Sequence, residues 1–126
     1  MTRNIQVSDP HRISLGEALE TALGALHYAS RCQEMASGDP QEFHDWGWVF
    51  VEITETLYAV NKGIDRQLVA HPRGTLAPAD RARLQQIRGH LALLGVALAD
   101  AGTHARGFYE LASRFGSVVT ENAQNH

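Results

Sequence analysis

The residues best suited to binding chemistry are six cations that cluster in the middle of the chain. Between positions 61 and 90 the sequence has six basic residues against two acidic ones, Asp65 and Asp80. Between positions 13 and 60 it has eight acidic residues against one basic residue, Arg31. A local excess of cationic side chains attracts phosphate, nucleic acid or an acidic protein surface. The predicted contact residues are Lys62, Arg66, Arg73, Arg81, Arg83 and Arg88.

This basic segment has more than one reading. No aromatic residue lies between positions 61 and 90, so the segment lacks the rings on which nucleic-acid bases stack. The net charge of the whole chain is −3, which gives no general attraction to nucleic acid or to an anionic membrane. We therefore expect an acidic protein partner, or charge pairing between two subunits. A nucleic-acid-binding regulator and a merely solvated tip remain alternatives.

Arg83 and His90 are seven residues apart, so on a helix they lie on one face, two turns from each other. An arginine followed at this distance by a histidine on a bundle helix resembles the HEPN ribonuclease motif. The resemblance implies an RNase or toxin in which Arg83 and His90 of two subunits meet at a dimer interface and cut RNA. The residue after Arg83 is Leu84, where that family commonly has a polar residue.

Other catalytic chemistry finds no support in the sequence. His90 and His104 share a helical phase, but fourteen residues separate them, which is about 21 Å along a helix. The paired Glu-x-x-His motifs of carboxylate-bridged metal bundles are absent from the sequence. There is no glycine-rich phosphate loop and no nucleophile elbow. We therefore predict no metal site and no cofactor, and we favour a function that is not enzymatic over the alternative of a HEPN-like RNase that uses Arg83 and His90.

The element that must position these residues is a long helix over about 78–115. Its apolar residues recur at alternating spacings of three and four, the pattern of a helix packed against another helix. Gly95 and Gly102 form a small-residue stripe beside this seam, and a kink near Gly102 would not be surprising. The predicted seam consists of Leu84, Ile87, Leu91, Leu94, Leu98, Ala101, Ala105, Phe108, Ala112 and Phe115.

Two earlier helices are predicted over about 14–36 and 40–70. Ser14 with Glu17 and Asp39 with Glu42 each form the serine-or-aspartate capping pattern of a helix start, and Pro40 suits the first helical position. The loop chemistry of residues 71–74 separates the second helix from the third. The predicted seam of the second helix consists of Phe43, Trp46, Phe50, Ile53, Leu57, Val60 and Ile64.

The predicted fold is all-α, a long antiparallel helical hairpin with a shorter N-terminal helix packed along its base as a three-helix bundle. Residues 14–116 form one domain, 1–13 a flexible arm and 117–126 a disordered tail. The most apolar run, 91–99, is too short to cross a membrane. The single cysteine, Cys32, excludes an internal disulfide and favours a reducing compartment, the cytoplasm.

The lengths of these helices predict a partner. The first helix is too short to cover the whole hairpin, which leaves the tip with only two helices and suggests a homodimer, two hairpins forming a four-helix bundle. Trp48 and Tyr58 point away from the predicted seam and form a possible second patch. We therefore expect a non-enzymatic protein-interaction or assembly module that forms a homodimer with coiled-coil packing and uses the basic tip as a partner surface.

Overall fold

The computed structural model describes residues 13–32 and 38–125; side chains are described as far as Phe115, except that of Arg73. The helices are α2 (Leu15–Cys32), α3 (Pro40–Ala70), the 3-10 turn η3 (Arg73–Thr75) and α4 (Pro78–Asn125). No strand occurs within these described ranges. The chain is all-α, as predicted. It divides into two units, Met1–Ser37 and Gly38–His126, which are described separately below.

The first unit contains α2, whose start is capped by Ser14. The Ser14 hydroxyl oxygen accepts a hydrogen bond from the Glu17 amide at 3.1 Å, and the hydroxyl donates to the Glu17 carboxylate at 3.1 Å. Leu15, Leu19 and Leu26 lie along one stripe of this helix, and none of its residues is buried. The predicted arm, up to residue 12, and the predicted helix end near residue 36 lie outside the described residues. Packing of this helix on the hairpin stays a prediction.

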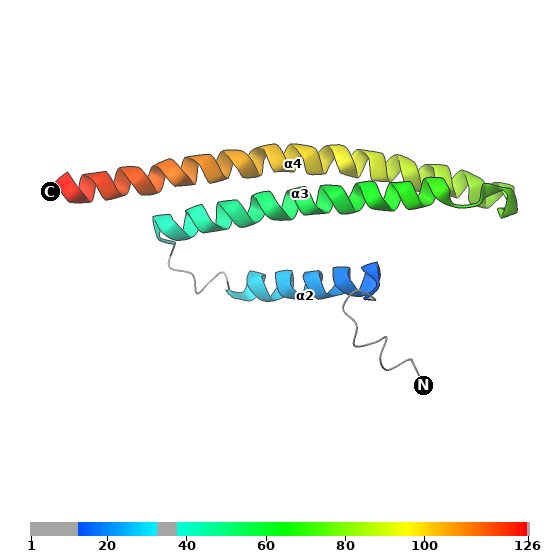
Figure 1. The fold of residues 1–126 in the computed structure, drawn as a ribbon, viewed down its shortest axis with the longest axis horizontal. Coiled ribbons are helices and arrows are strands. Elements are labelled where there is room, and N and C mark those ends of the chain that lie inside the picture. Colours follow the sequence, from blue (N-terminus) through cyan, green and yellow to red (C-terminus); the bar gives the residue numbers. More distant parts are fainter. Residues whose placement is uncertain (1–12, 33–37, 126) are drawn as a thin grey trace, which may run out of the picture. The chain divides into compact units, whose positions relative to one another are not determined.

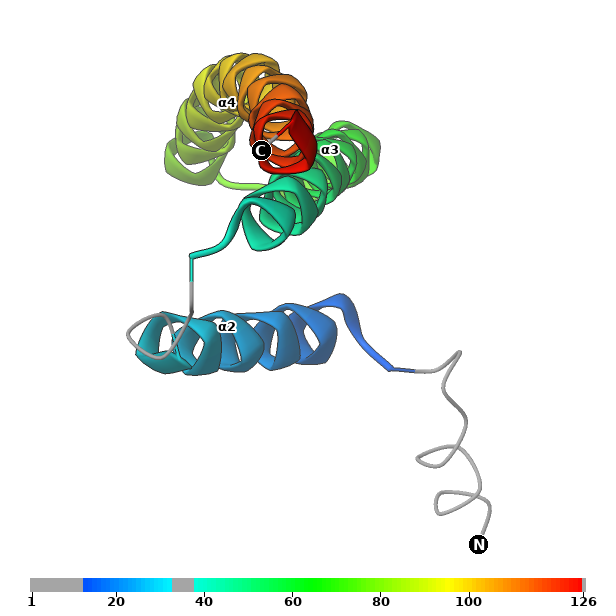
Figure 2. The ribbon, with the colours of Figure 1, turned by 90° about the vertical axis from the view of Figure 1, so that its left-hand side faces the viewer.

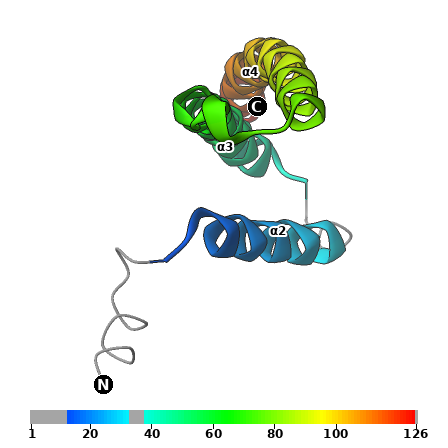
Figure 3. The same cartoon turned by 90° about the vertical axis from the view of Figure 1, so that its right-hand side faces the viewer.

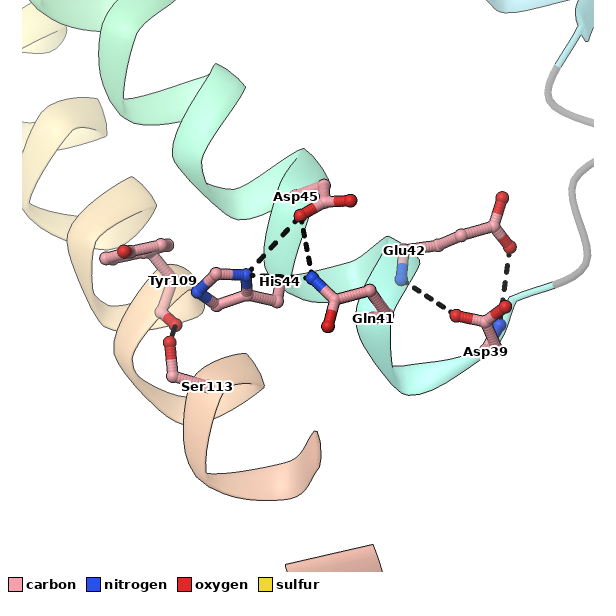
Figure 4. Close-up of polar contacts among 7 residues, drawn as sticks. All are labelled: Asp39, Gln41, Glu42, His44, Asp45, Tyr109 and Ser113. Carbon is pink, nitrogen blue, oxygen red and sulfur yellow. Dashed lines mark hydrogen bonds and ion pairs between the residues drawn. The ribbon is translucent and has the colours of Figure 1, made fainter. Parts of the chain in front are cut away.

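The second unit begins with a complete capping box at the start of α3. The Asp39 carboxylate accepts a hydrogen bond from the Glu42 amide at 2.9 Å, and the Glu42 carboxylate accepts from the Asp39 amide at 3.4 Å (Figure 4). The Gly38 amide also donates to Glu42, at 2.8 Å. Gly38 has a φ of 72°, a conformation that glycine adopts without strain. Together with Pro40 at the first helical position, these contacts fix where α3 begins.

The α4 helix is longer and more regular than the sequence suggests. It passes through Gly102 without a break, and it continues to Asn125 where we expected a disordered tail. A helical glycine costs about 1 kcal/mol relative to alanine, which a long helix tolerates. No proline follows Pro78, so the backbone hydrogen bonds of the helix can continue beyond Gly116.

Helices α3 and α4 pack side by side in opposite directions along the length of α3 (Figures 1, 2 and 3). The turn that joins them includes η3, and the Arg81 guanidinium donates a hydrogen bond to the Leu76 carbonyl at 2.8 Å there. The long antiparallel hairpin predicted from the sequence is confirmed.

The residues that face each other across the hairpin differ from the predicted seams. The buried positions are Gly47, Val51 and Asn61 on α3 and Leu84, Gly95, Ala105 and Ala112 on α4. On α3 this contact stripe is displaced by about one residue from the predicted seam. On α4 it shares alternate seam positions, such as Leu84 and Ala105, and replaces the others with their neighbours. The prediction of the packing faces is therefore wrong: both helices are rotated about their own axes relative to the predicted arrangement.

A close backbone approach explains this rotation. A Cβ atom on Gly47 would lie 2.8 Å from the Tyr109 Cα, closer than Cβ contacts occur in proteins. On Gly95 a Cβ would lie 3.0 Å from the Asn61 side-chain oxygen. No side chain larger than glycine fits at these two points. The large apolar residues of the predicted α3 seam lie to the side of the contact, while the contact itself contains Val51 and Leu84 beside small and polar residues.

Two polar contacts fix the register of the hairpin. The buried Asn61 amide donates a hydrogen bond to the Leu91 carbonyl at 3.1 Å. One turn further toward the tip, the Arg88 guanidinium donates two hydrogen bonds to the Asp65 carboxylate, at 2.9 and 3.3 Å. A polar residue in a helical seam selects one register, because sliding the helices would leave its polar atoms unpaired.

Candidate functional site

The displaced side chains of α3 and α4 form one continuous apolar surface, which we call the open apolar face. Its two rows lie on the same side of the hairpin, because the Phe50 and Phe108 ring centroids are 6.0 Å apart and those of Phe43 and Phe115 are 6.5 Å apart. The α3 row consists of Phe43, Trp46, Phe50, Ile53, Leu57, Val60 and Ile64, and the α4 row of Ile87, Leu94, Ala101, Phe108 and Phe115.

This face exposes side chains that proteins ordinarily bury. Phe50 is 51% exposed, Leu94 is 50% exposed and Ile87 is 49% exposed. Among the described residues, only four apolar side chains are buried, namely Val51, Leu84, Ala105 and Ala112. Contiguous exposed apolar surface of this kind marks sites where proteins bind other proteins or membranes.

The dimensions of the face favour a helical partner. From Phe43 to Ile64 the α3 row spans about 32 Å at the rise of an α-helix. The α3 row and the α4 row run parallel along the hairpin, so helices of a partner can pack lengthwise against them. The face does not enclose a small molecule, for which proteins use concave pockets.

The opposite side of the hairpin is more polar and is grooved. Two adjoining hollows share Tyr58 and Ala99, and small residues of α4 such as Gly95 and Gly102 form part of their lining. The Lys62 ammonium lies 5.2 Å from the centre of the Tyr58 ring, a cation–π contact. The groove and the open apolar face thus lie on opposite sides of the hairpin.

The predicted second patch is split by the structure. Tyr58 is half-buried and lines the groove, whereas Trp48 is half-exposed near the base of α3, where its ring centroid lies 5.6 Å from that of Tyr109. Tyr109 also meets His44, with centroids 5.0 Å apart (Figure 4). Trp48 and Tyr58 thus contact different parts of the hairpin and do not form a single cluster.

The predicted basic residues gather around the tip, where several of them have partners within the chain. The Arg83 guanidinium contacts Asp80 at 2.8 Å, Arg88 is bound by Asp65, and Arg81 is bound to the Leu76 carbonyl. The remaining two whose side chains are described, Lys62 and Arg66, are exposed; the side chain of Arg73 lies outside the described set.

The Arg88–Asp65 pair is the best-formed ion pair of the tip. Hydrogen bonding from Arg88 lowers the pKa of the Asp65 carboxyl, partial burial opposes this shift, and the charges of Arg88 and Lys62 add to the lowering. The same hydrogen bond raises the pKa of Arg88. Both side chains are about one-third exposed, so the pair is partly shielded from water.

The Arg83 and His90 side chains are both exposed on α4. Each lies within one helical turn of Ile87, so both flank the open apolar face. The Arg83 guanidinium is engaged by Asp80 within its own chain. A catalytic site of the HEPN type would require the same two residues from a second copy.

Two further features, a metal-binding cluster and a membrane-spanning helix, are absent from the described part of the chain. It contains no group of three histidine, cysteine, aspartate or glutamate side chains placed to hold a metal ion. None of its helices combines the length and the apolarity that a membrane crossing requires.

Comparisons with known proteins add no family to this description. No family model, no curated protein and no solved structure shows a significant match to the chain.

The open apolar face is the feature that sequence reasoning missed. The heptad pattern correctly selects its residues but assigns them to the contact between α3 and α4. The signal that could have found it is the second stripe of small and polar residues, including Gly47, Asn61, Gly95 and Gly102, at the same three-and-four spacing. Two glycine-containing stripes that face each other indicate a close contact beside the apolar seams, not at them.

Proposed function

We propose that this chain is a non-enzymatic protein-interaction module that acts as a homodimer, with the open apolar face as its dimerisation surface. The observation that carries the proposal is the continuity of this face across both helices, shown by the Phe50–Phe108 and Phe43–Phe115 ring contacts. Pairing two such hairpins face to face creates a four-helix bundle whose core consists of the two faces.

The energetic argument compares what the hairpin buries with what it leaves in water. Burial of apolar surface contributes roughly 25 cal/mol per Å². Among the described apolar side chains, the hairpin buries only Val51, Leu84, Ala105 and Ala112, while others such as Phe50 and Leu94 stay half-exposed to water. Association through the face therefore supplies stabilisation that the isolated hairpin lacks.

A second copy is the proposed occupant because it presents a surface of identical length and composition. Closed two-fold dimers are the commonest protein assemblies, and their interfaces use the same patch on both subunits. The α2 helix of the same chain is the competing occupant. In keeping with the single cysteine, we place this dimer in a reducing compartment such as the cytoplasm.

Light scattering at micromolar concentration tests the proposal through a matched pair of variants. Leu94 lies on the open apolar face, while Val96, two residues away and 69% exposed, lines the groove on the opposite side. We expect a dimer for the wild type and for Val96→Lys, and a helical monomer for Leu94→Lys. A monomeric wild type, or equal loss of mass by both variants, would refute the proposal.

A further inference from the structure

We propose that the groove on the polar side of the hairpin binds a small amphipathic anion, an apolar molecule that carries one acidic group and one N–H or O–H donor. The groove and the open apolar face lie on opposite sides of the hairpin, so this site does not depend on whether the dimer forms. Three features carry the proposal: the shape of the groove, a nearly buried amide oxygen without a partner, and a cation beside it.

The groove has the size of a small-molecule site and is bounded along the hairpin. Its larger hollow has a volume of about 460 Å³, within the range of ligand pockets, and the adjoining hollow has about 230 Å³. Each hollow contains an ion pair that bridges α4 and α3, Arg88–Asp65 in the larger and Arg106–Glu55 in the smaller. The two arginines are 18 residues apart, about 27 Å along the helix. A compact ligand fits between these pairs, whereas a long helix would have to cross them.

Small residues of α4 create the space. They recur at spacings of three and four, so they lie along one side of the helix. These residues are Ala92, Gly95, Ala99 and Gly102. The Tyr58 ring of α3 stands beside them and lines both hollows. The lining is therefore mostly apolar and suits the apolar body of a ligand.

Asn61 supplies a hydrogen-bond acceptor in the larger hollow. Its side chain is only 6% exposed, and its amide nitrogen donates to the Leu91 carbonyl at 3.1 Å. Its side-chain oxygen accepts no hydrogen bond from the residues that the structure describes. Among these residues no side-chain oxygen or nitrogen is both sealed from solvent and unpaired, so this oxygen must reach solvent, and Asn61 lines the hollow. A ligand N–H or O–H placed there would satisfy this acceptor.

Lys62 gives the same hollow a net positive charge. The charged residues that line it are two cations, Lys62 and Arg88, and one anion, Asp65. Arg88 and Asp65 neutralise each other in their ion pair. Lys62 is exposed, and its ammonium lies 5.2 Å from the centre of the Tyr58 ring, a contact that leaves N–H donors for an anion. The acidic group of the ligand is therefore placed at Lys62, next to the donor bound by Asn61.

Fluorescence titration with anilinonaphthalene sulfonate tests the site, because this probe combines apolar rings, one anionic group and one N–H. Ala99→Leu places a larger side chain in both hollows. Ala97→Leu is the matched control, since Ala97 is an exposed alanine of α4 that lines neither hollow. We expect Ala99→Leu to raise the Kd about tenfold or more, the effect of one methylene in an apolar pocket, and Ala97→Leu to leave it unchanged. Equal Kd values for the two leucine variants, or no saturable binding to the wild type, would overturn the site.

Two analogues of the probe separate the charge from the hydrogen bond. Phenylnaphthylamine lacks the sulfonate, and the N-methyl derivative of the sulfonate lacks the N–H. Lys62→Gln should raise the Kd of the sulfonate about two- to fivefold, as for an exposed ion pair, and leave that of phenylnaphthylamine unchanged. N-methylation should raise the Kd of the wild type about two- to tenfold, through loss of one hydrogen bond to Asn61.

Circular dichroism checks that each variant is helical, and Lys62→Gln, at an exposed position, keeps the test decisive if Ala99→Leu does not fold. An equal effect of Lys62→Gln on the charged and the uncharged probe would overturn the placement of the acidic group. An unchanged Kd for the N-methyl derivative would overturn the role of the Asn61 oxygen.

Discussion

The contact between α3 and α4 and the open apolar face beside it are built from the same three-and-four spacing of residues, but they differ in composition. The contact between the helices buries Val51 and Leu84 and is closest at two glycines: Gly47 admits the backbone of Tyr109, and Gly95 admits the side chain of Asn61, which supplies a hydrogen bond. The open apolar face beside it is wide, aromatic and exposed. Specificity within the chain therefore comes from close approach and polar pairing, and in the proposed dimer the larger hydrophobic driving force acts in association.

Substitution of Gly47 should weaken the contact between α3 and α4 more than any other change described below. Alanine there would place a methyl group 2.8 Å from the Tyr109 Cα, in contact with backbone that cannot move independently. We expect Gly47→Ala to lower the free energy of unfolding by about 1–3 kcal/mol, the usual cost of overpacking. Urea denaturation followed by circular dichroism measures the change.

Gly89→Ala is the matched control for Gly47→Ala. Gly89 is also in a long helix, but an added Cβ meets nothing within 4 Å. Alanine should therefore stabilise the protein by up to about 1 kcal/mol, through helix propensity alone. If both substitutions changed stability in the same direction, the close contact at Tyr109 would not be what positions the helices.

Substitution of Asn61 tests the polar part of the contact, with a smaller expected change in the free energy of unfolding. Asn61→Ala removes the hydrogen bond to the Leu91 carbonyl, and we expect a loss of about 1 kcal/mol in the free energy of unfolding. Thr56→Ala, at an exposed position of the same helix, should be nearly neutral in the same urea titration. An unchanged midpoint for Asn61→Ala would show that the buried amide does not stabilise this register.

The Asp65–Arg88 pair gives the smallest expected effect, and one that depends on pH. Because Arg88 lowers the pKa of Asp65 in the folded chain, the pair contributes stability above the ordinary carboxyl pKa of 3.8. That contribution is lost as the pH falls below this value toward the lowered pKa of the folded state.

Thermal unfolding between about pH 5 and pH 3 checks this prediction, since that window spans the ordinary carboxyl pKa. The wild type should lose stability more steeply than Asp65→Asn as the pH falls. Asp80→Asn, which removes the more exposed partner of Arg83, should leave the slope of the wild type nearly intact. Identical slopes for the wild type and Asp65→Asn would contradict the role assigned to the pair.

The sequence allowed the helices to be predicted better than their packing. Capping residues such as Asp39 and Glu42 are local, so the start of α3 could be read directly. The facing surfaces could not, because two stripes of α3 and α4 share the same three-and-four spacing, and hydrophobicity selects the wrong one. The close contact at Gly47 depends on Tyr109, a residue 62 positions away, and such pairs are invisible to local patterns.

The sequence indicated which residues belong to the candidate sites, but not which of them contact one another. The basic residues of the tip were selected from the sequence, and the Arg83–Asp80 pair is local to one helix, whereas the Arg88–Asp65 pair depends on the register of α4 against α3. Trp48 and Tyr58 were grouped because both point away from the predicted seam. They are ten positions apart on α3, and the packing of α3 places Tyr58 in the groove and Trp48 against Tyr109.

The capping box at the start of α3 has a practical consequence for protein engineering. Residues 38–42 close the first turn of the helix with their own side chains and backbone, and Gly38 lets the chain arrive from an unusual direction. A hairpin whose beginning is closed in this way is portable: whatever sequence is joined upstream of Gly38, the first amides of α3 keep their acceptors. In fusion proteins and chimaeras, the junction should therefore be placed immediately before Gly38.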